Sequence, residues 1–290
     1  MKAQRFGSAH TEKKLQLVAD YLQGYMRALK NQPFRKLYVD AFAGTGAWTG
    51  GRADDQMQLG LIDPDAIAEG SALRALRIDP PFDRYVFIEV SRRKTSALQN
   101  RLQEFPTLCN RIDVITQDAN DALRELCQKT NWRNSRAVVF LDPFGFQVDW
   151  STVESLARTN AVDLWYLVPT GIGINRQITT DGRVLHVGGE RIDAMLGTTE
   201  WRNRLTKIEA SPIDLFGQSI ARGSKAGGIH EIAAFVIERL QSIFKGGAVS
   251  YGLPLGTQGR AMYTLVFACA NPAPKAHKLA LKLASAVLKT

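Results

Sequence analysis

The sequence predicts an α/β fold built on a mostly parallel sheet. Apolar strand-like runs alternate with helix-like segments five times, and these runs are apolar throughout rather than at every second residue. Strands of that kind suit a parallel sheet covered by helices on both faces. A glycine-rich loop follows the first run, at the position where a doubly wound sheet binds its ligands.

The expected elements follow from hydrophobic spacing and from Pro, Gly and Ser boundaries. Helices are predicted over 12–29, 67–78, 91–105, 121–129, 151–158 and 229–244, and from 272 onward. Parallel strands are predicted over 37–42, 84–90, 111–116, 137–141 and 162–168. A terminal antiparallel hairpin is expected over 248–253 and 262–270, which makes seven strands in all.

The length of 290 residues suits one large domain, 1–290, with an insertion. The regular alternation breaks over 171–228, which we interpret as an insertion, lid or substrate-recognition segment. Two short helices, 190–196 and 199–208, are expected within it. The segment 50–64 is expected to be a loop.

Composition narrows the class of protein and its partners. A net charge of +9 and a pI near 9.6 favour an anionic partner, of which nucleic acid is the commonest. Cys109, Cys127 and Cys269 are far apart and lie in apolar surroundings, which predicts buried free thiols in a cytoplasmic protein. No signal-like segment and no membrane-length apolar run is present, and the histidines share no metal-ligand spacing.

The glycine loop Asp40–Gly46 reads Asp-Ala-Phe-Ala-Gly-Thr-Gly and follows the first predicted strand. It lacks the Gly-Lys-Ser/Thr of a phosphate loop and the third glycine of a dinucleotide-binding fingerprint. It resembles motif I of methyltransferases, common among enzymes that act on nucleic acid. The resemblance implies that S-adenosylmethionine binds here, at Asp40, Phe42, Ala43, Gly44 and Gly46. The alternative is a tight strand-to-helix turn without a ligand.

Two acidic residues follow the next strands and extend the predicted cofactor site. Glu89 ends the second strand, where a carboxylate can accept both ribose hydroxyls, although its offset from Asp40 exceeds the usual spacing. Asp118, followed by Ala119, comes after the third strand and is a candidate partner for an adenine amino group. The alternative role for Asp118 is to cap the next helix.

Asp142-Pro143-Phe144-Gly145 follows the fourth strand and resembles the Asp/Asn-Pro-Pro-Tyr/Phe tetrad of amino-group methyltransferases. Acceptors at Asp142 and the Pro143 carbonyl are placed to hold the two hydrogens of an exocyclic amine. Phe144 or Phe146 would then be the ring that stacks on the base. Phe144 stands in the second proline position and glycine in the aromatic position, so a polar strand end without catalysis is the alternative. Cytosine-C5 chemistry is disfavoured because no cysteine follows a proline.

Weaker candidates lie outside these motifs. Asn175 and Arg176 follow the fifth strand and are candidate substrate contacts. Lys14 could pair with a cofactor carboxylate, but a solvated lysine is the expectation. Trp201 and its basic neighbours suit either target recognition or packing of the lid.

Three segments together resemble the three-Cys-motif partner protein family. They are the helix start at 14–22, the loop at 38–46 and the Phe-Leu-Asp-Pro-Phe-Gly run at 140–145, with further likeness at 70–76 and 263–268. The resemblance implies a Rossmann-like class I methyltransferase fold and a gene-paired companion protein that carries the three cysteines. The sequence therefore predicts a methyltransferase dependent on S-adenosylmethionine that acts on an amino group in DNA or RNA. The alternative is a non-catalytic or partner-dependent module that binds cofactor or nucleic acid.

Overall fold

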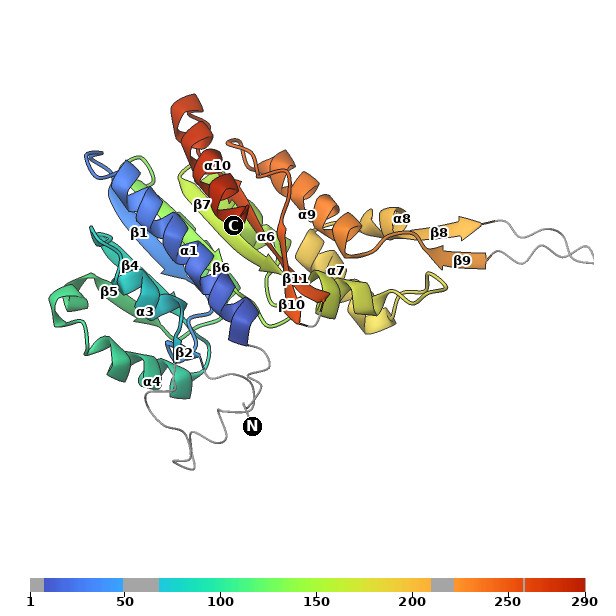
Figure 1. The fold of residues 1–290 in the computed structure, drawn as a ribbon, viewed down its shortest axis with the longest axis horizontal. Coiled ribbons are helices and arrows are strands. Elements are labelled where there is room, and N and C mark those ends of the chain that lie inside the picture. The colour runs from blue at the N-terminus through green and yellow to red at the C-terminus, as the bar shows by residue number, and fades with distance from the viewer. Residues whose placement is uncertain (1–7, 49–67, 210–221, 258, 290) are drawn as a thin grey trace, which may run out of the picture.

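A seven-stranded sheet with helices on both faces organises the molecule (Figure 1). The computed structural model describes residues 8–48, 68–209, 222–257 and 259–289. The strand order is β10-β11-β7-β6-β1-β4-β5. This order, with an antiparallel hairpin at one edge, confirms the predicted class I methyltransferase topology. The predicted loop at 50–64 lies outside the described residues.

Five strands form the parallel part of the sheet. They are β1 (Arg35–Asp40), β4 (Arg84–Ile88), β5 (Ile112–Ile115), β6 (Ser135–Leu141) and β7 (Val162–Val168). Strand β1 lies between β4 and β6, and Asp40 is in register with Phe87 and with Phe140. From β1 the chain continues to β4 and β5 on one side and then crosses to β6 and β7 on the other side. The strand order therefore switches at β1, and sheets of this kind bind ligands at the carboxyl end of the strands beside such a switch.

The antiparallel edge consists of β10 (Leu253–Thr257) and β11 (Arg260–Cys269), and β11 pairs with β7. The hairpin is therefore present, but its first strand lies later than the predicted 248–253. Within 248–253, Ala248 forms an isolated bridge with Ala268, and the continuous pairing with β11 begins at the last residue, Leu253, and runs to Thr257.

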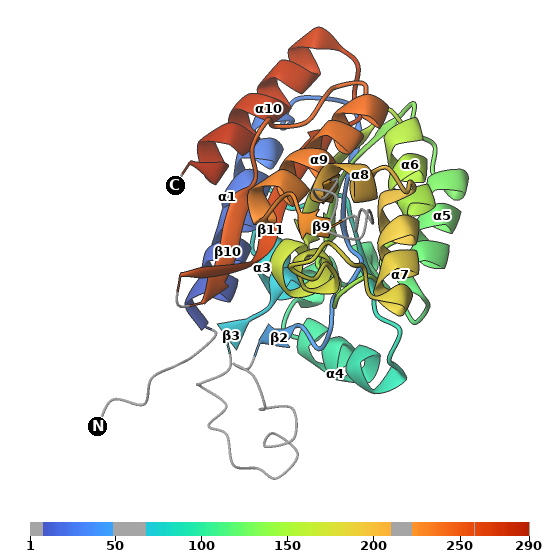
Figure 2. The same ribbon diagram turned by 90° about the vertical axis from the view of Figure 1, so that its right-hand side faces the viewer.

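Helices α1 (Ser8–Ala28), α3 (Ser71–Leu76), α4 (Arg92–Leu102) and α10 (Pro274–Leu288) contribute to the core on one face. This core is aromatic: Tyr21 lies 5.3 Å from Trp165 and 5.0 Å from Phe267, measured between ring centroids. Figure 2 shows α1 and α10 on one side of the sheet and α5, α6 and α7 on the other.

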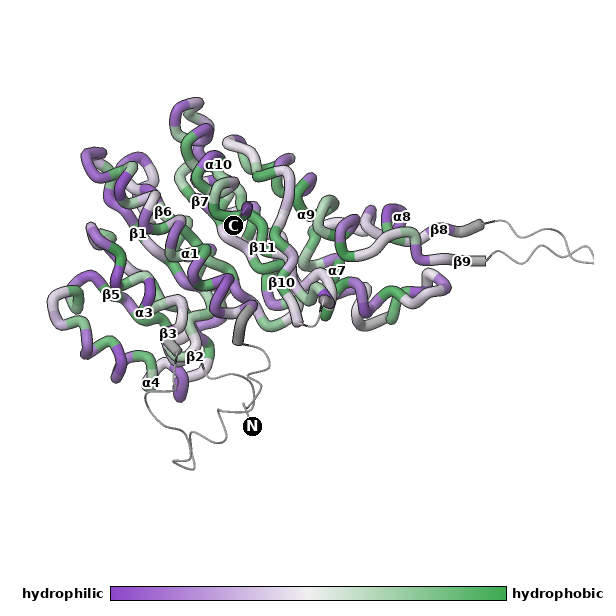
Figure 3. Tube along the Cα trace, in the orientation of Figure 1, coloured by the Kyte–Doolittle hydropathy of each residue, from purple (hydrophilic) through white to green (hydrophobic). Residues whose placement is uncertain are grey.

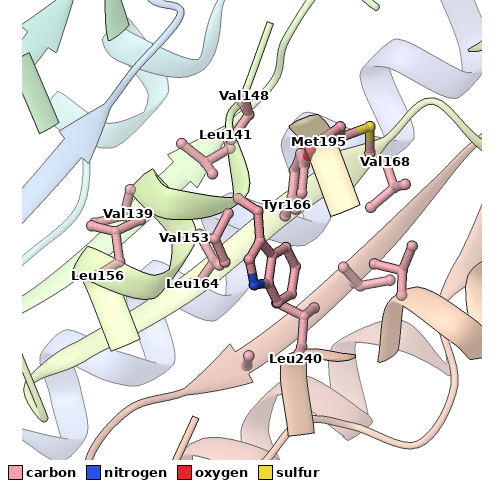
Figure 4. Close-up of a cluster of buried hydrophobic side chains, with 14 of the residues drawn as sticks. Val139, Leu141, Val148, Val153, Leu156, Leu164, Tyr166, Val168, Met195 and Leu240 are labelled. Carbon is pink, nitrogen blue, oxygen red and sulfur yellow. The ribbon is translucent and has the colours of Figure 1, made fainter. Parts of the chain in front are cut away.

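The opposite face is covered by α5 (Ala119–Lys129), α6 (Trp150–Arg158), α7 (His186–Leu196), α8 (Trp201–Leu205) and α9 (Ile229–Ile243). Figure 4 shows aliphatic residues of β6 and β7, among them Val139 and Leu164, packed with Met195 and Leu240. Figure 3 shows the hydrophobic stretches concentrated in the strands and in the helix faces against them. Two helices of the 171–228 segment thus contribute side chains to the core.

The segment after β7 departs from its prediction. It begins with a π-helical turn (Thr170–Asn175), and Thr206–Glu209 forms β8 rather than the end of a helix. Strand β8 pairs with β9 (Arg222–Lys225), and this ribbon projects from the body in Figure 1. Helix α8 ends at Leu205 because the backbone of the next residue, Thr206, is extended (φ −130°, ψ 146°). Thr206 is β-branched, which favours a strand over a helix, and it begins β8.

Smaller elements complete the fold. Strand β2 (Ala47–Trp48) pairs with β3 (Ala68–Glu69), and a 3₁₀ helix spans Pro106–Arg111. The three cysteines are free, as predicted, but only Cys269 is buried: Cys127 is half-buried, and Cys109 is exposed because it lies on that surface turn. Within the described residues, no helix is long and apolar enough to cross a membrane.

Candidate active site

The carboxyl ends of β1, β4, β5 and β6 bring the main predicted site residues to one edge of the sheet. Asp40 ends β1, Glu89 follows β4, Asp118 lies beyond β5 and Asp142 follows β6. Backbone bonds tie these ends together: Ala41 donates to Phe140, and Ala43 donates to Ile88. The structure therefore places the loop, the acidic residues and the Asp-Pro-Phe-Gly motif along a common edge.

Two glycines give the loop a shape that other residues adopt rarely. Gly44 has φ 59° and Gly46 has φ 72°, both in the left-handed region. A Cβ at Gly46 would lie 2.7 Å from Leu98 Cδ1, whereas a Cβ at Gly44 would meet no atom within 4 Å. Gly46 is thus required for packing against α4, while Gly44 leaves backbone open to a ligand.

Asp40 is fully buried and holds the glycine loop in place through two hydrogen bonds. Its Oδ2 accepts a hydrogen bond from Ser71 Oγ at 2.5 Å, and its Oδ1 accepts one from the Phe42 amide at 3.2 Å. Burial raises the pKa of this carboxyl to about 7, although the bonds from Ser71 and Phe42 oppose the shift. Asp40 therefore shapes the loop through its bonds to Phe42 and to the start of α3.

Glu89 and Val90 form the neighbouring part of the edge. Glu89 is 9% exposed, and its Oε1 accepts a hydrogen bond from the Ser91 amide at 2.8 Å. Val90 is 65% exposed, so an apolar side chain lies at the surface directly after β4. Ser91 caps α4, as predicted, with its Oγ accepting from the Lys94 amide. A carboxylate and an apolar surface thus lie side by side.

Asp118 is the N-cap of α5. Its Oδ1 accepts from the amide of Asn120 at 2.8 Å and from that of Asp121 at 3.4 Å, and Ala119 begins the helix in a buried position. The capping role is therefore real. Its contact with an adenine amino group remains a prediction.

Asp142 is held by a lysine from the N-terminal helix. Lys14 Nζ forms an ion pair with Asp142 Oδ2, and it lies 6.0 Å from the centroid of the Phe140 ring. Lys14 is only 7% exposed, so the expectation of a solvated lysine is wrong. The reason is its helical phase: Lys14 shares the buried face of α1 with Val18 and Tyr21.

The two phenylalanines of the motif differ in exposure. Phe144 is 75% exposed, and Lys94 Nζ lies 5.6 Å from its ring centroid. Phe146 is partly buried against the core and lies within 3.2 Å of where a Cβ on Gly173 would be. Phe144 thus presents a free ring face at the edge, while Phe146 packs against the turn that follows β7.

Asn175 is the last residue of the turn that follows β7, and Arg176 comes directly after it. Asn175 Oδ1 is buried and has no hydrogen-bond partner in the described part of the chain, and the Asn175 backbone oxygen accepts a bond from Lys225 Nζ at 2.6 Å. Arg176 is exposed. Trp201 is fully buried and donates to Asp193, so this residue packs in the core.

Sequence reasoning missed Ser71 and Lys94 as site residues, and it considered Lys14 only as a partner for a cofactor carboxylate, not for Asp142. Lys14 gave one signal, because a charged residue on the apolar face of a predicted helix needs a buried partner. Ser71 and Lys94 gave none, since their contacts join segments far apart in the chain. Among the described residues, no cluster of His, Cys, Asp or Glu could hold a metal ion.

Comparisons with known proteins find distant structural likeness only. No family model and no curated protein matches this chain. A DUF519-family protein from Legionella pneumophila is 12% identical, with 98% of this chain and 94% of that chain covered and a TM-score of 0.45. Human methyltransferase-like protein 13 in complex with S-adenosylhomocysteine is 10% identical, with 97% and 93% covered and a TM-score of 0.42.

A third structure is magnesium protoporphyrin IX methyltransferase from Synechocystis with bound S-adenosylmethionine. It is 12% identical, with 73% of this chain and 78% of that chain covered and a TM-score of 0.31. All three TM-scores are below 0.5. The interpretation of the site in this chain therefore rests on its own strand order and geometry.

Proposed function

We propose that this protein is a methyltransferase dependent on S-adenosylmethionine, acting on an exocyclic amino group in DNA or RNA. One observation carries the proposal. The Asp-Pro-Phe motif after β6 lies beside the glycine loop after β1, and it presents an acidic side chain and an exposed aromatic ring. That pairing supplies an acceptor for an amine and a stacking surface for its base next to a cofactor loop.

The residues around the glycine loop fit the cofactor. Gly44 leaves room for close approach of a ligand, Glu89 offers its second carboxylate oxygen to ribose hydroxyls, and Val90 offers an apolar surface to a ring. Asp118 and Ala119 would border the adenine. When bound, S-adenosylmethionine supplies an activated methyl group on a sulfonium.

Asp142 and Pro143 would orient the acceptor amine. Lys14 occupies Asp142 Oδ2, and Oδ1 accepts no hydrogen bond from the described part of the chain. This oxygen and the Pro143 carbonyl would accept the two amine hydrogens, which turns the nitrogen lone pair toward the methyl group. Positive charge would develop on the amine nitrogen as it accepts the methyl group. Asp142 would stabilise this charge until a proton leaves.

Charge near Phe144 supports a polynucleotide as the acceptor. Residues 91–103 contain Arg92, Arg93, Lys94 and Arg101 and no acidic residue. Lys94 contacts the exposed Phe144 ring, so a base stacked on Phe144 would bring its phosphate toward these cations. Phe146, Asn175 and Arg176 would lie farther along the same substrate path.

Calorimetric titration with S-adenosylmethionine tests the cofactor site. Gly44→Asn is the better blocking variant, because asparagine tolerates positive φ and its side chain would fill the open space. A bulky residue at Gly46 would instead strike Leu98 and unsettle the fold. We expect wild type to bind and Gly44→Asn to lose at least about tenfold in affinity. Failure of folded wild type to bind would refute the proposal.

Mass spectrometry of nucleosides from treated RNA and DNA tests the acceptor. We expect N-methylated base in one of the two pools with wild type, and at least about a tenfold loss with Phe144→Ala at unchanged cofactor affinity. Phe34→Ala is a matched control, since this ring stacks on Arg136 away from the site. Methylation of added protein or small molecules alone would overturn the nucleic-acid assignment.

A partner-dependent function is the second candidate, and the Lys14–Asp142 ion pair favours it. The pair occupies one oxygen of the proposed acceptor, and Phe144-Gly145 departs from the amino-methyltransferase tetrad. In this alternative a three-Cys-motif companion protein binds the chain and enables transfer, or the chain only binds cofactor and nucleic acid. Cofactor binding without methylated product, followed by product when the companion is added, would favour it.

A further inference from the structure

A cavity lies at the opposite end of the parallel strands from the candidate active site. It has a volume of about 310 Å³, within the range of small-molecule pockets. Helices α1 and α10 form its walls, and the amino ends of β6 and β7 and the carboxyl end of β11 form its floor. None of the predicted cofactor or catalytic residues lines it.

The walls of this cavity are apolar. Tyr25 and Leu29 line it from α1, Leu279 and Leu283 line it from α10, and Phe34 lies at its side. Leu279 is 41% exposed, which is high for a leucine that faces a neighbouring helix. An apolar molecule between the two helices would remove this surface from water.

The floor carries a buried carboxyl group. Asp163 is 8% exposed, and its Oδ2 accepts a hydrogen bond from Tyr21 Oη at 2.7 Å. Burial raises the pKa of Asp163 to about 6, and Tyr21, Cys269 and Arg136 oppose the shift. At neutral pH the cavity therefore contains the negative charge of Asp163, which already accepts a hydrogen bond from Tyr21.

Two cations also line the cavity, and neither has a carboxylate partner within 4 Å among the described residues. Arg136 stacks on Phe34 at 3.9 Å and donates through Nη1 to the backbone oxygens of Trp132 and Ser135. Lys275 lies at the exposed start of α10. With Asp163 counted as negative, the two cations leave one positive charge unmatched.

We propose that this cavity binds a small amphipathic monoanion, with its acidic head at Arg136 and Lys275 and its apolar body between α1 and α10. A carboxylate head matches the planar donors of the arginine and adds the missing negative charge. The body fills the space beside Leu29, Leu279 and Leu283. Because the cavity lies away from the cofactor loop, binding here is independent of the proposed methyl transfer.

Calorimetric titration with octanoate, octan-1-ol and octylamine tests this inference. The three probes share an apolar chain and differ in the charge of the head. We expect saturable binding of octanoate at least about tenfold tighter than of either other probe. Equal binding of octanoate and octan-1-ol, or no saturable binding of octanoate, would overturn the proposal.

Variants locate the binding site. Lys275→Gln should weaken octanoate binding about fivefold or more, while Lys282→Gln, an equal charge change on α10 outside the cavity, should leave it unchanged. Ala276→Phe should fill the cavity and abolish binding, as should Ala28→Phe from the α1 side. Gly44→Asn should not alter octanoate binding. Undiminished binding by both folded phenylalanine variants would place the ligand elsewhere and refute the site.

Discussion

Helix α1 reaches a carboxyl group at each end of the sheet, and the two ends differ. Near its start, Lys14 pairs with Asp142 beyond the carboxyl end of β6. Two turns later, Tyr21 donates to Asp163 near the amino end of β7. The Asp142 side chain is 26% exposed and is followed by the protruding Phe144, whereas Asp163 is buried between helices.

This contrast shows how position in the fold decides what an aspartate does. At the carboxyl edge, the chain leaves each strand into a loop, and Asp142, whose side chain is 26% exposed, pairs there with the positive charge of Lys14. At the other edge, α1 and α10 cover the strand ends, and burial raises the pKa of Asp163 to about 6. Charged chemistry is therefore expected at the first end and ligand enclosure at the second.

The largest expected effect separates the two aspartates by activity. Asp142→Ala should lower the rate of methyl transfer on the order of 10³-fold with cofactor affinity nearly unchanged, because the developing charge on nitrogen loses its partner. Asp163→Asn should leave the rate within about twofold. Single-turnover transfer of a labelled methyl group measures both. Similar losses in the two variants would erase the functional distinction between the ends of the sheet.

Removal of the α1 cation should have a smaller, mixed effect. Lys14→Gln leaves Asp142 without its counter-ion, and we expect about 1–3 kcal/mol less stability and roughly a tenfold lower kcat with KM little changed. Denaturant unfolding and steady-state kinetics measure these. Lys14→Arg should restore most of kcat, and Arg27→Gln on the same helix should change neither quantity. A Lys14→Gln variant with full activity would show that Lys14 only stabilises the fold.

The stability of the protein should depend on pH through its buried carboxyl groups. The pKa of Asp40 is raised from 3.8 to about 7, so between these values the folded protein keeps a proton that the unfolded chain releases. Wild type should lose stability as pH rises from about 4 to about 7, by up to about 1.4 kcal/mol per pH unit. Asp40→Asn removes this loss, so its stability relative to wild type should increase across that window.

Urea unfolding at pH 4, 5, 6, 7 and 8 provides the measurement. For Asp163→Asn the same increase should end near pH 6, since the pKa of that group is raised only to about 6. A constant difference between Asp40→Asn and wild type at every pH would show that Asp40 is ionised in the fold throughout this range.

Local pattern was sufficient for much of the architecture. The continuous apolar runs predicted all five parallel strands, and the cap at Ser91 and the glycines of the loop appear where the sequence placed them. The prediction was poorest where local signals were weak. Strand β8 was read as helix, and β10 lies at 253–257 because the pairing with β11, which no local pattern reveals, selects those residues.

The candidate site divides in the same way. Asp40, Glu89, Asp118 and Asp142 were identified from the sequence because each lies at or just after the end of an apolar run, and parallel strands end at one edge. Asp40 and Asp142 also belong to motifs that resemble those of methyltransferases. The partners of these residues were not identified. Ser71 reaches Asp40 across 31 residues of chain and Lys14 reaches Asp142 across 128, so the contacts exist only once the sheet is assembled.

By itself, the sequence determined the order of the five parallel strands along the chain, the glycines of the loop and the place of the acidic residues at strand ends. These follow from residue type and spacing within a few turns of chain. Only the tertiary structure decided that Lys14 is buried against Asp142, that Phe144 rather than Phe146 is exposed, and that α1 and α10 together line a cavity. These features depend on which distant segments the sheet brings together. The burial of a side chain and the strength of its charge interactions are defined only once those segments are packed.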